Sequence, residues 1–167
     1  ISSDTISTAP IASPNLIVDD TIAVDEATIM ASESDDSSSG ITEETVYNLI
    51  NNYYSDLNVN NFDANQYFSQ NVDNYINLKN TTPDEINNLF INTDFQDANS
   101  ILIDDSLTFE NSKEDLSYWS YWIKYSCYRA SKNKYQECEV KIIIGLDDQM
   151  HIRSYKEVKV ENLKFHL

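Results

Sequence analysis

Two neighbouring stretches of alternating residues, 118–130 and 134–146, limit the possible folds of this chain more than any other feature. Apolar and polar side chains alternate along both, as is typical of β-strands with one buried face. The polar residues 131–134 between them predict a turn, so we expect an antiparallel hairpin. The register that puts the apolar groups of both strands on one face pairs Tyr121 with Ile144, Ile123 with Ile142, Tyr125 with Val140 and Cys127 with Cys138.

A second hairpin is predicted to turn at residues 147–149. A three-residue loop there places Ile144 opposite Ile152, which keeps apolar side chains together. A two-residue loop would place Ile144 opposite His151 instead. We therefore expect the three-residue loop.

These registers sort the aromatic residues of the strands onto two faces. The inward set is predicted either to be core or to line a pocket, and it comprises Tyr53 from a helix together with Trp119, Tyr121 and Tyr125. The outward set mixes aromatic and basic residues, as protein interfaces do, and it comprises Tyr118, Trp122, Lys124, Tyr128, Lys141, Arg153 and Tyr155. Scattered, solvated surface residues are the alternative interpretation of the outward set.

Signals of helices precede these strands. Thr42 is a predicted N-cap, and apolar residues recur at three-four spacing as far as Leu57, so a helix is expected over residues 42–57. Thr82 and Pro83 are typical of the start of another helix. Between the two we expect a short helix at 64–70 and a strand at 72–78. After Phe95 a further strand is expected, with Ile101, Ile103, Leu107 and Phe109 on its inner side.

This order predicts an α+β fold, in which N-terminal helices pack on one face of a curved antiparallel sheet. The helix at 42–57, the step Phe62-Asp63-Ala64, the helix start Thr82-Pro83-Asp84-Glu85-Ile86 and the hairpin at 140–155 resemble the nuclear transport factor two-like superfamily (SnoaL-like, cystatin-like cone). The resemblance covers nearly all of residues 41–160. It implies a cone-shaped domain with an internal pocket, in a superfamily that includes enzymes, carriers and assembly modules.

Residues 1–40 have a different composition, with nine Ser, four Thr, eight acidic residues and neither Lys nor Arg. Such a segment has too little apolar surface to offset the entropy of ordering it. We therefore predict a largely disordered acidic stalk at 1–40 and one folded domain at 41–167. Two apolar patches, 16–18 and 22–24, are either a docking motif, a strand added to a sheet edge, or ordinary parts of a tether.

The formal net charge of −17 argues against nucleic acid and against an anionic membrane surface as partners. Direct membrane insertion is not expected either, because no apolar run has the roughly 18 residues that a spanning helix needs. Ten of the eleven basic residues nevertheless lie between Lys113 and Lys164. The stalk suits display of the domain outside the cytoplasm, in a periplasm or at a cell surface, with an anchor ahead of Ile1.

The residues that carry chemistry are few. If Cys127 and Cys138 are directly opposed, they can form a disulfide, which implies an oxidising compartment; two buried thiols are the alternative. Two Cys without a nearby His supply too few ligands for a zinc site, and no motif indicates a cofactor. No catalytic residue is assigned, and Asp105, on the predicted inner side of its strand, is the best candidate acid or base.

The sequence therefore predicts a non-catalytic protein-binding or assembly domain that meets itself, as a homodimer, or another protein through the outer sheet face. The alternative is a domain that uses the internal pocket to bind a small hydrophobic ligand or to act as a lyase or isomerase. A pocket plugged by Trp119, Tyr121 and Tyr125 would exclude that alternative. A structural spacer with neither pocket nor sticky face is the third hypothesis.

Overall fold

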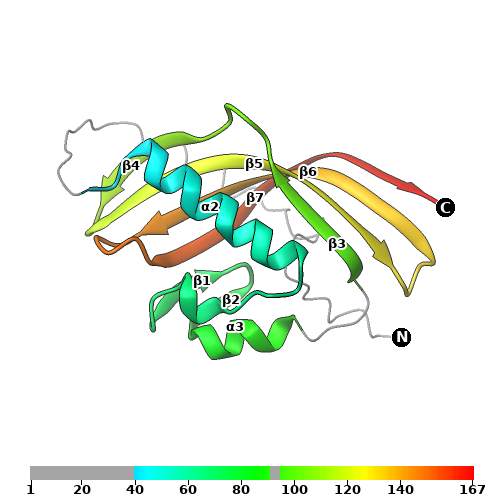
Figure 1. Ribbon diagram of the computed structural model, residues 1–167, viewed down its shortest axis with the longest axis horizontal. Helices are drawn as coiled ribbons and strands as arrows, with labels where there is room; N and C mark the ends of the chain where they lie inside the picture. The colour runs from blue at the N-terminus through cyan, green and yellow to red at the C-terminus, as the bar shows by residue number, and fades with distance from the viewer. Residues whose placement is uncertain (1–39, 91–94) are drawn as a thin grey trace.

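A computed structural model describes residues 40–90 and 95–167, which form an α+β fold with a strongly curled sheet (Figure 1). The prediction for residues 1–40 falls almost wholly outside these residues and stays a prediction. The elements are α2 (Glu43–Asn58), the 3₁₀ turn η2 (Ala64–Gln66), β1 (Val72–Tyr75), β2 (Leu78–Thr81), α3 (Pro83–Leu89), β3 (Phe95–Leu102), β4 (Thr108–Lys113), β5 (Leu116–Arg129), β6 (Lys134–Leu146) and β7 (Ile152–His166).

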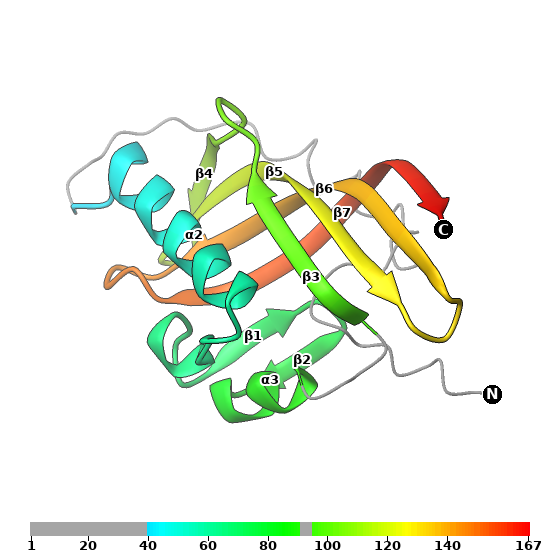
Figure 2. The same cartoon turned by 45° about the vertical axis from the view of Figure 1, so that its right-hand side comes forward.

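The strands lie in the order β2-β1-β7-β6-β5-β3, and β4 also pairs with β5. The sheet is mixed rather than antiparallel throughout, because β1 runs parallel to β7. Figures 1 and 2 show α2 lying across the sheet, while β5, β6 and β7 continue beyond it toward the end that carries the C-terminus. None of the described helices is long and apolar enough to cross a bilayer.

Both predicted helix starts are confirmed. The hydroxyl oxygen of Thr42 accepts a hydrogen bond from the Thr45 N–H at 3.1 Å, and Glu43 and Glu44 lie in the first turn, where the helix dipole favours carboxylates. Thr82 caps α3 in the same way, with Pro83 in the first turn, where a missing N–H costs no helical bond.

The segment between the two helices differs from the prediction. The expected helix at 64–70 is only the 3₁₀ turn at 64–66. The expected strand at 72–78 is broken into β1 and β2, because Ile76 has a φ of 56° and the chain reverses there. Periodicity alone did not reveal this turn, since no Gly or Pro marks it.

Asp105 lies in an exposed turn between β3 and β4, with a φ of 65°. Its predicted place on an inner strand face is therefore wrong, and its exposure leaves it without the burial that would tune an acid or base. The prediction for its neighbours is wrong in part: Ile101 and Phe109 are 55% and 43% exposed, whereas Leu107 packs against the core as predicted. The turn separates β3 from β4, whereas the alternating pattern predicted one continuous strand.

The long hairpin of β5 and β6 forms as predicted, but its register differs by two residues. The loop is Ala130–Asn133, so Tyr121 pairs with Ile142 and Ile123 with Val140. Because side chains alternate every residue, a shift of two leaves every side chain on its predicted face. Ile123 and Ile142 are accordingly fully buried, and the sorting of the hairpin into inner and outer faces is confirmed.

In the second hairpin, formed by β6 and β7, the predicted assignment of side chains to inner and outer faces is wrong. Ile152 pairs with Leu146 rather than with Ile144 as predicted, because Asp147 holds a wider loop with its carboxylate, which accepts the N–H of His151 at 2.9 Å. A β-bulge in β7 follows this pair, and beyond the bulge Ile144 pairs with Tyr155. One extra residue reverses the faces of a strand. Tyr155 is therefore in the core, 1% exposed, and not on the outer face as predicted.

Candidate functional site

The outer face of β5, β6 and β7 carries side chains in rows that cross the three strands. One row is basic and aromatic, and its members are Trp122, Lys141 and Lys159. The next row carries both charges, and its members are Lys124, Glu139 and Glu161. Lys159 reaches across to Glu161, with 2.9 Å between Nζ and Oε2. Opposite charges therefore lie side by side on one surface.

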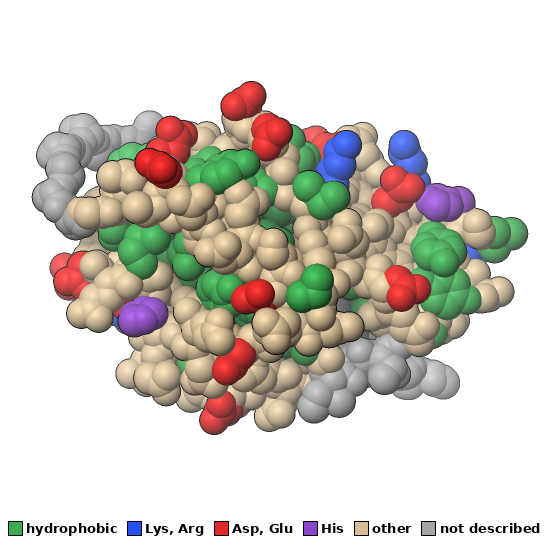
Figure 3. Space-filling view, viewed as in Figure 1, with side chains coloured by type: hydrophobic (Ala, Val, Ile, Leu, Met, Phe, Trp, Pro, Cys, Tyr) green, Lys and Arg blue, Asp and Glu red, His purple; other side chains and the backbone are tan. Residues whose placement is uncertain are grey.

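Two further rows follow toward the C-terminal end. One consists of Ser126, Glu137 and Lys164, and the other of Tyr128, Tyr135 and His166. The last row is joined by ring contacts, with 5.1 Å between the centroids of Tyr128 and Tyr135 and 6.1 Å between those of Tyr135 and His166. Figure 3 shows hydrophobic and histidine side chains together at this end of the molecule.

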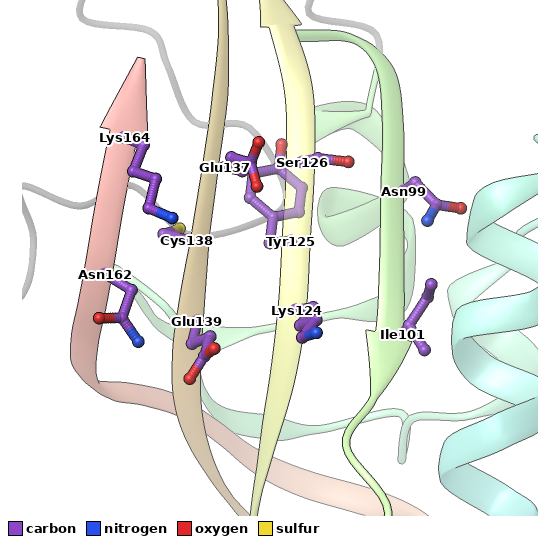
Figure 4. A pocket seen from close by; sticks show the side chains of 10 residues that line it. All are labelled: Asn99, Ile101, Lys124, Tyr125, Ser126, Glu137, Cys138, Glu139, Asn162 and Lys164. Atoms are coloured by element: carbon purple, nitrogen blue, oxygen red, sulfur yellow. The ribbon is translucent and has the colours of Figure 1, made fainter. Parts of the chain in front are cut away.

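A hollow of about 290 Å³ lies across the middle rows (Figure 4). Lys124 and Lys164 supply positive charge to it, and Glu137 and Glu139 supply negative charge. Its other lining residues are Asn99, Ile101, Tyr125, Ser126, Cys138 and Asn162. A mixed, polar lining of this kind suits polar groups of a protein surface better than an apolar small molecule.

Six residues of the outward set, all except Tyr118, are the ones predicted to bind a partner, and five of these six are at least partly exposed. Trp122, Tyr128 and Lys141 are half-buried on the outer face, and Lys124 is exposed there. Arg153 is half-buried, but it lies at the bulge and its Nη2 bonds to Asp73 of β1 at 3.1 Å. The sixth, Tyr155, belongs to the core, as described above. The structure thus brings together Trp122, Lys124, Lys141 and Tyr128, and leaves Arg153 and Tyr155 out.

The inner face is dominated by tyrosine rings. Tyr54 of α2 joins two strands, since its hydroxyl is 2.6 Å from that of Tyr155 and 3.1 Å from that of Tyr121. Tyr53, on the same helix, stacks on Tyr155 with 5.7 Å between ring centroids. Tyr75 of β1 closes the cluster, 5.1 Å from Tyr155. These rings bind the helix to the sheet.

A carboxyl group lies beside this cluster. Glu157 of β7 faces inward opposite Ile142 and is 9% exposed, and neither of its carboxyl oxygens has a hydrogen-bond partner. Burial raises the pKa of Glu157 well above its ordinary value, because it disfavours the charged form.

Three buried hydroxyls near Glu157 also lack a hydrogen-bond partner, those of Tyr53, Tyr75 and Tyr125. Burial raises the pKa of all three, and a charge on Glu157 would raise them further. Each buried polar group without a partner costs about 1–3 kcal/mol, and native structures hold few of them. The two carboxyl oxygens of Glu157 and these three hydroxyls are five such atoms together, and they mark a place where water or a ligand is expected.

The residues predicted to line a pocket all face inward, since Tyr53, Trp119, Tyr121 and Tyr125 are at most 6% exposed. Trp119 packs on Phe109 of β4, with 5.1 Å between ring centroids, and its Nε1 donates to Ser117 Oγ at 3.2 Å. The pocket itself stays a prediction.

The two cysteines are not directly opposed, because the register shift pairs Cys138 with Tyr125 and Cys127 with Gln136. Both are buried thiols and neither is joined in a disulfide. Burial raises the pKa of Cys138 to about 12, so its thiol is protonated and poorly reactive at neutral pH. The expectation of a disulfide is corrected accordingly, and it no longer supports export.

Sequence reasoning missed Glu157 and the central role of Tyr54 and Tyr75. The helical spacing of the apolar residues predicted that Tyr54 lies in the core. Spacing does not predict which hydroxyl groups its own hydroxyl contacts. Glu157 was missed because the bulge reverses its face. No family model matches this chain, and no curated protein has a similar sequence.

Proposed function

We propose that this domain is a non-catalytic assembly module that contacts a second copy of itself through the outer face of β5, β6 and β7. Display outside the cytoplasm and membership of the nuclear transport factor two-like superfamily belong to the same proposal. The curled sheet with helices packed on it is compatible with that superfamily.

The observation that carries the proposal is the complementarity of two adjacent rows. Consider a dimer whose two-fold axis runs parallel to these two rows and midway between them. The first row of each copy would then lie over the second row of the other copy. Lys141 would then meet Glu139, and Lys159 would meet Glu161. Trp122 would meet Lys124, a favourable contact between a cation and an aromatic face.

The first test is sedimentation velocity on the wild type and on Trp122→Ala over a wide concentration range. The half-buried indole is the largest apolar group in the two rows. We expect a concentration-dependent dimer in the wild type and a dissociation constant at least about tenfold higher in the variant, because interface Trp residues commonly contribute more than 1 kcal/mol. A wild type that stays monomeric at every concentration would overturn the proposal.

A second candidate function is binding of a small ligand beside Glu157. The five buried oxygen atoms without hydrogen-bond partners favour it. A protonated acid and tyrosine hydroxyls can each donate a hydrogen bond, so a mainly apolar molecule with a carbonyl oxygen would suit this site. The close packing of Tyr53, Tyr75 and Tyr155 means that such a ligand would have to displace rings on entry.

Cyclohexanone is a suitable probe for this second function. Binding would shift the NMR signals of the inner tyrosines in the wild type and in the surface control Glu161→Leu, but not in Glu157→Leu. Equal responses in all three proteins, or none in any, would exclude the site.

A further inference from the structure

β7 has a strand neighbour on both sides only near its beginning. Tyr75 of β1 pairs with Tyr155, and the N–H of Ile76 donates to the carbonyl oxygen of Tyr155 at 2.9 Å. Among the residues that the structure describes, Lys156–His166 pairs with β6 alone. This part of β7 is therefore an open sheet edge, which offers backbone N–H and C=O groups to an added strand.

The open edge is rich in lysine. Lys156, Lys159 and Lys164 are exposed along it, and Glu161 is its one partly exposed acidic residue. Lys156 and Lys164 form no ion pair with any other described residue. Lysines on an edge discourage pairing with neutral strands. A strand that brings carboxylates would be attracted instead, so the edge selects its partner by charge.

One segment of the same chain has the matching composition. Residues 16–26 combine the apolar patches 16–18 and 22–24 with four acidic residues and no basic one. Their Ile, Val and Thr residues favour extended structure. The segment is also as long as the open edge, since residues 16–26 and 156–166 span equal numbers of positions.

The chain between this segment and the fold is long enough to reach the edge. The described structure begins at Gly40, ahead of α2. The residues from 26 to 40 can span up to about 45 Å when extended. A domain of this size is only about 36 Å across, from the usual scaling of radius with length. The segment can therefore reach β7 within one molecule.

We propose that residues 16–26 bind along the open edge of β7 as an added strand of the same molecule. Main-chain hydrogen bonds would hold the strand, and its carboxylates would pair with Lys156, Lys159 and Lys164. The main-chain pairing would form at the edge of β7 and does not require the dimer proposed above, although Lys159 and Lys164 also belong to rows of the outer face.

The test is amide hydrogen exchange of the full chain, read by mass spectrometry on peptides that cover Lys156–His166. In the variant Ile22→Asp/Val24→Asp we expect exchange at this edge to be at least about tenfold faster than in the wild type, because edge amides without partners open freely. Ile11→Asp is the matched control, since it makes the same kind of change outside the segment, and it should leave the edge protected.

Three outcomes decide the matter. Equal exchange of the edge in the wild type and in Ile22→Asp/Val24→Asp would overturn the proposal. Protection that disappears on dilution would also overturn it, because the occupant would then be the segment of a second molecule. Loss of protection in 1 M NaCl and in Asp19→Asn/Asp20→Asn, with Ile11→Asp unaffected, would support the charge-selected edge. Trp122→Ala serves as a cross-check, since it removes the proposed dimer contact and should leave the edge protected.

Discussion

The two faces of β5, β6 and β7 are built from the same strands but follow different chemistry. The inner face holds tyrosine rings, aliphatic residues and one carboxyl group, all buried. The outer face holds rows of Lys and Glu with aromatic residues at either end. A buried core face and a charged surface are thus separated by a single step along the chain, because neighbours on a strand point to opposite faces.

The largest expected difference between the faces is in stability. Ile123→Ala should lower the free energy of unfolding by about 2–5 kcal/mol, because it leaves a cavity in the core. Lys124→Ala, the next residue, should change it by less than about 0.5 kcal/mol. Urea unfolding of both variants measures the contrast. Similar losses in the two would show that the faces are not distinct.

The next effect concerns pH and the inner carboxyl group. Because burial raises the pKa of Glu157, the folded state holds its proton where the unfolded chain, with a pKa of about 4.3, has released it. Stability is then greatest below that value and falls by up to about 1.4 kcal/mol per pH unit as the pH rises toward the folded pKa. Glu157→Gln should remove this slope.

Thermal unfolding between pH 5 and pH 8 measures this slope. Glu161→Gln, on the same strand but partly exposed, is the matched control and should keep the wild-type pH dependence. The difference in unfolding temperature between the wild type and Glu157→Gln is the quantity to compare. If this difference were the same at pH 8 as at pH 5, it would contradict a raised pKa of Glu157.

A smaller effect distinguishes tyrosines that share the inner face. Tyr155→Phe removes the hydroxyl that lies 2.6 Å from that of Tyr54, and should cost about 1–2 kcal/mol. Tyr53→Phe removes a buried hydroxyl with no hydrogen-bond partner, so it should be neutral or stabilising. Chemical unfolding of both variants gives the comparison. If Tyr53→Phe lost as much stability as Tyr155→Phe, the hydroxyl of Tyr53 would have a partner in solution, such as a bound water or ligand.

Much of this division could be predicted from the sequence. The error of two residues in the β5–β6 register was harmless, because a shift of two keeps Trp122 and Lys124 outside and Ile123 inside. The first of the bulges along β7 moved Tyr155 and Glu157 to the inner face; β7 itself has neither Gly nor Pro to mark it, and Gly145 opposite it on β6 was the one signal in the sequence. Short-range patterns therefore specify the faces of regular strands, whereas bulges and loop widths depend on contacts with distant residues.

The smallest effect on stability is expected in the charged rows of the outer face. Swapping the charges of these rows tests the proposed dimer most directly. Lys141→Glu and Glu139→Lys should each weaken the dimer, because each places like charges opposite one another across the proposed two-fold axis. An equimolar mixture of the two variants restores both pairings. Sedimentation velocity should therefore show mainly monomer for each variant alone and dimer for the mixture. A mixture no more associated than its components, with all proteins folded by circular dichroism, would contradict assembly through this face.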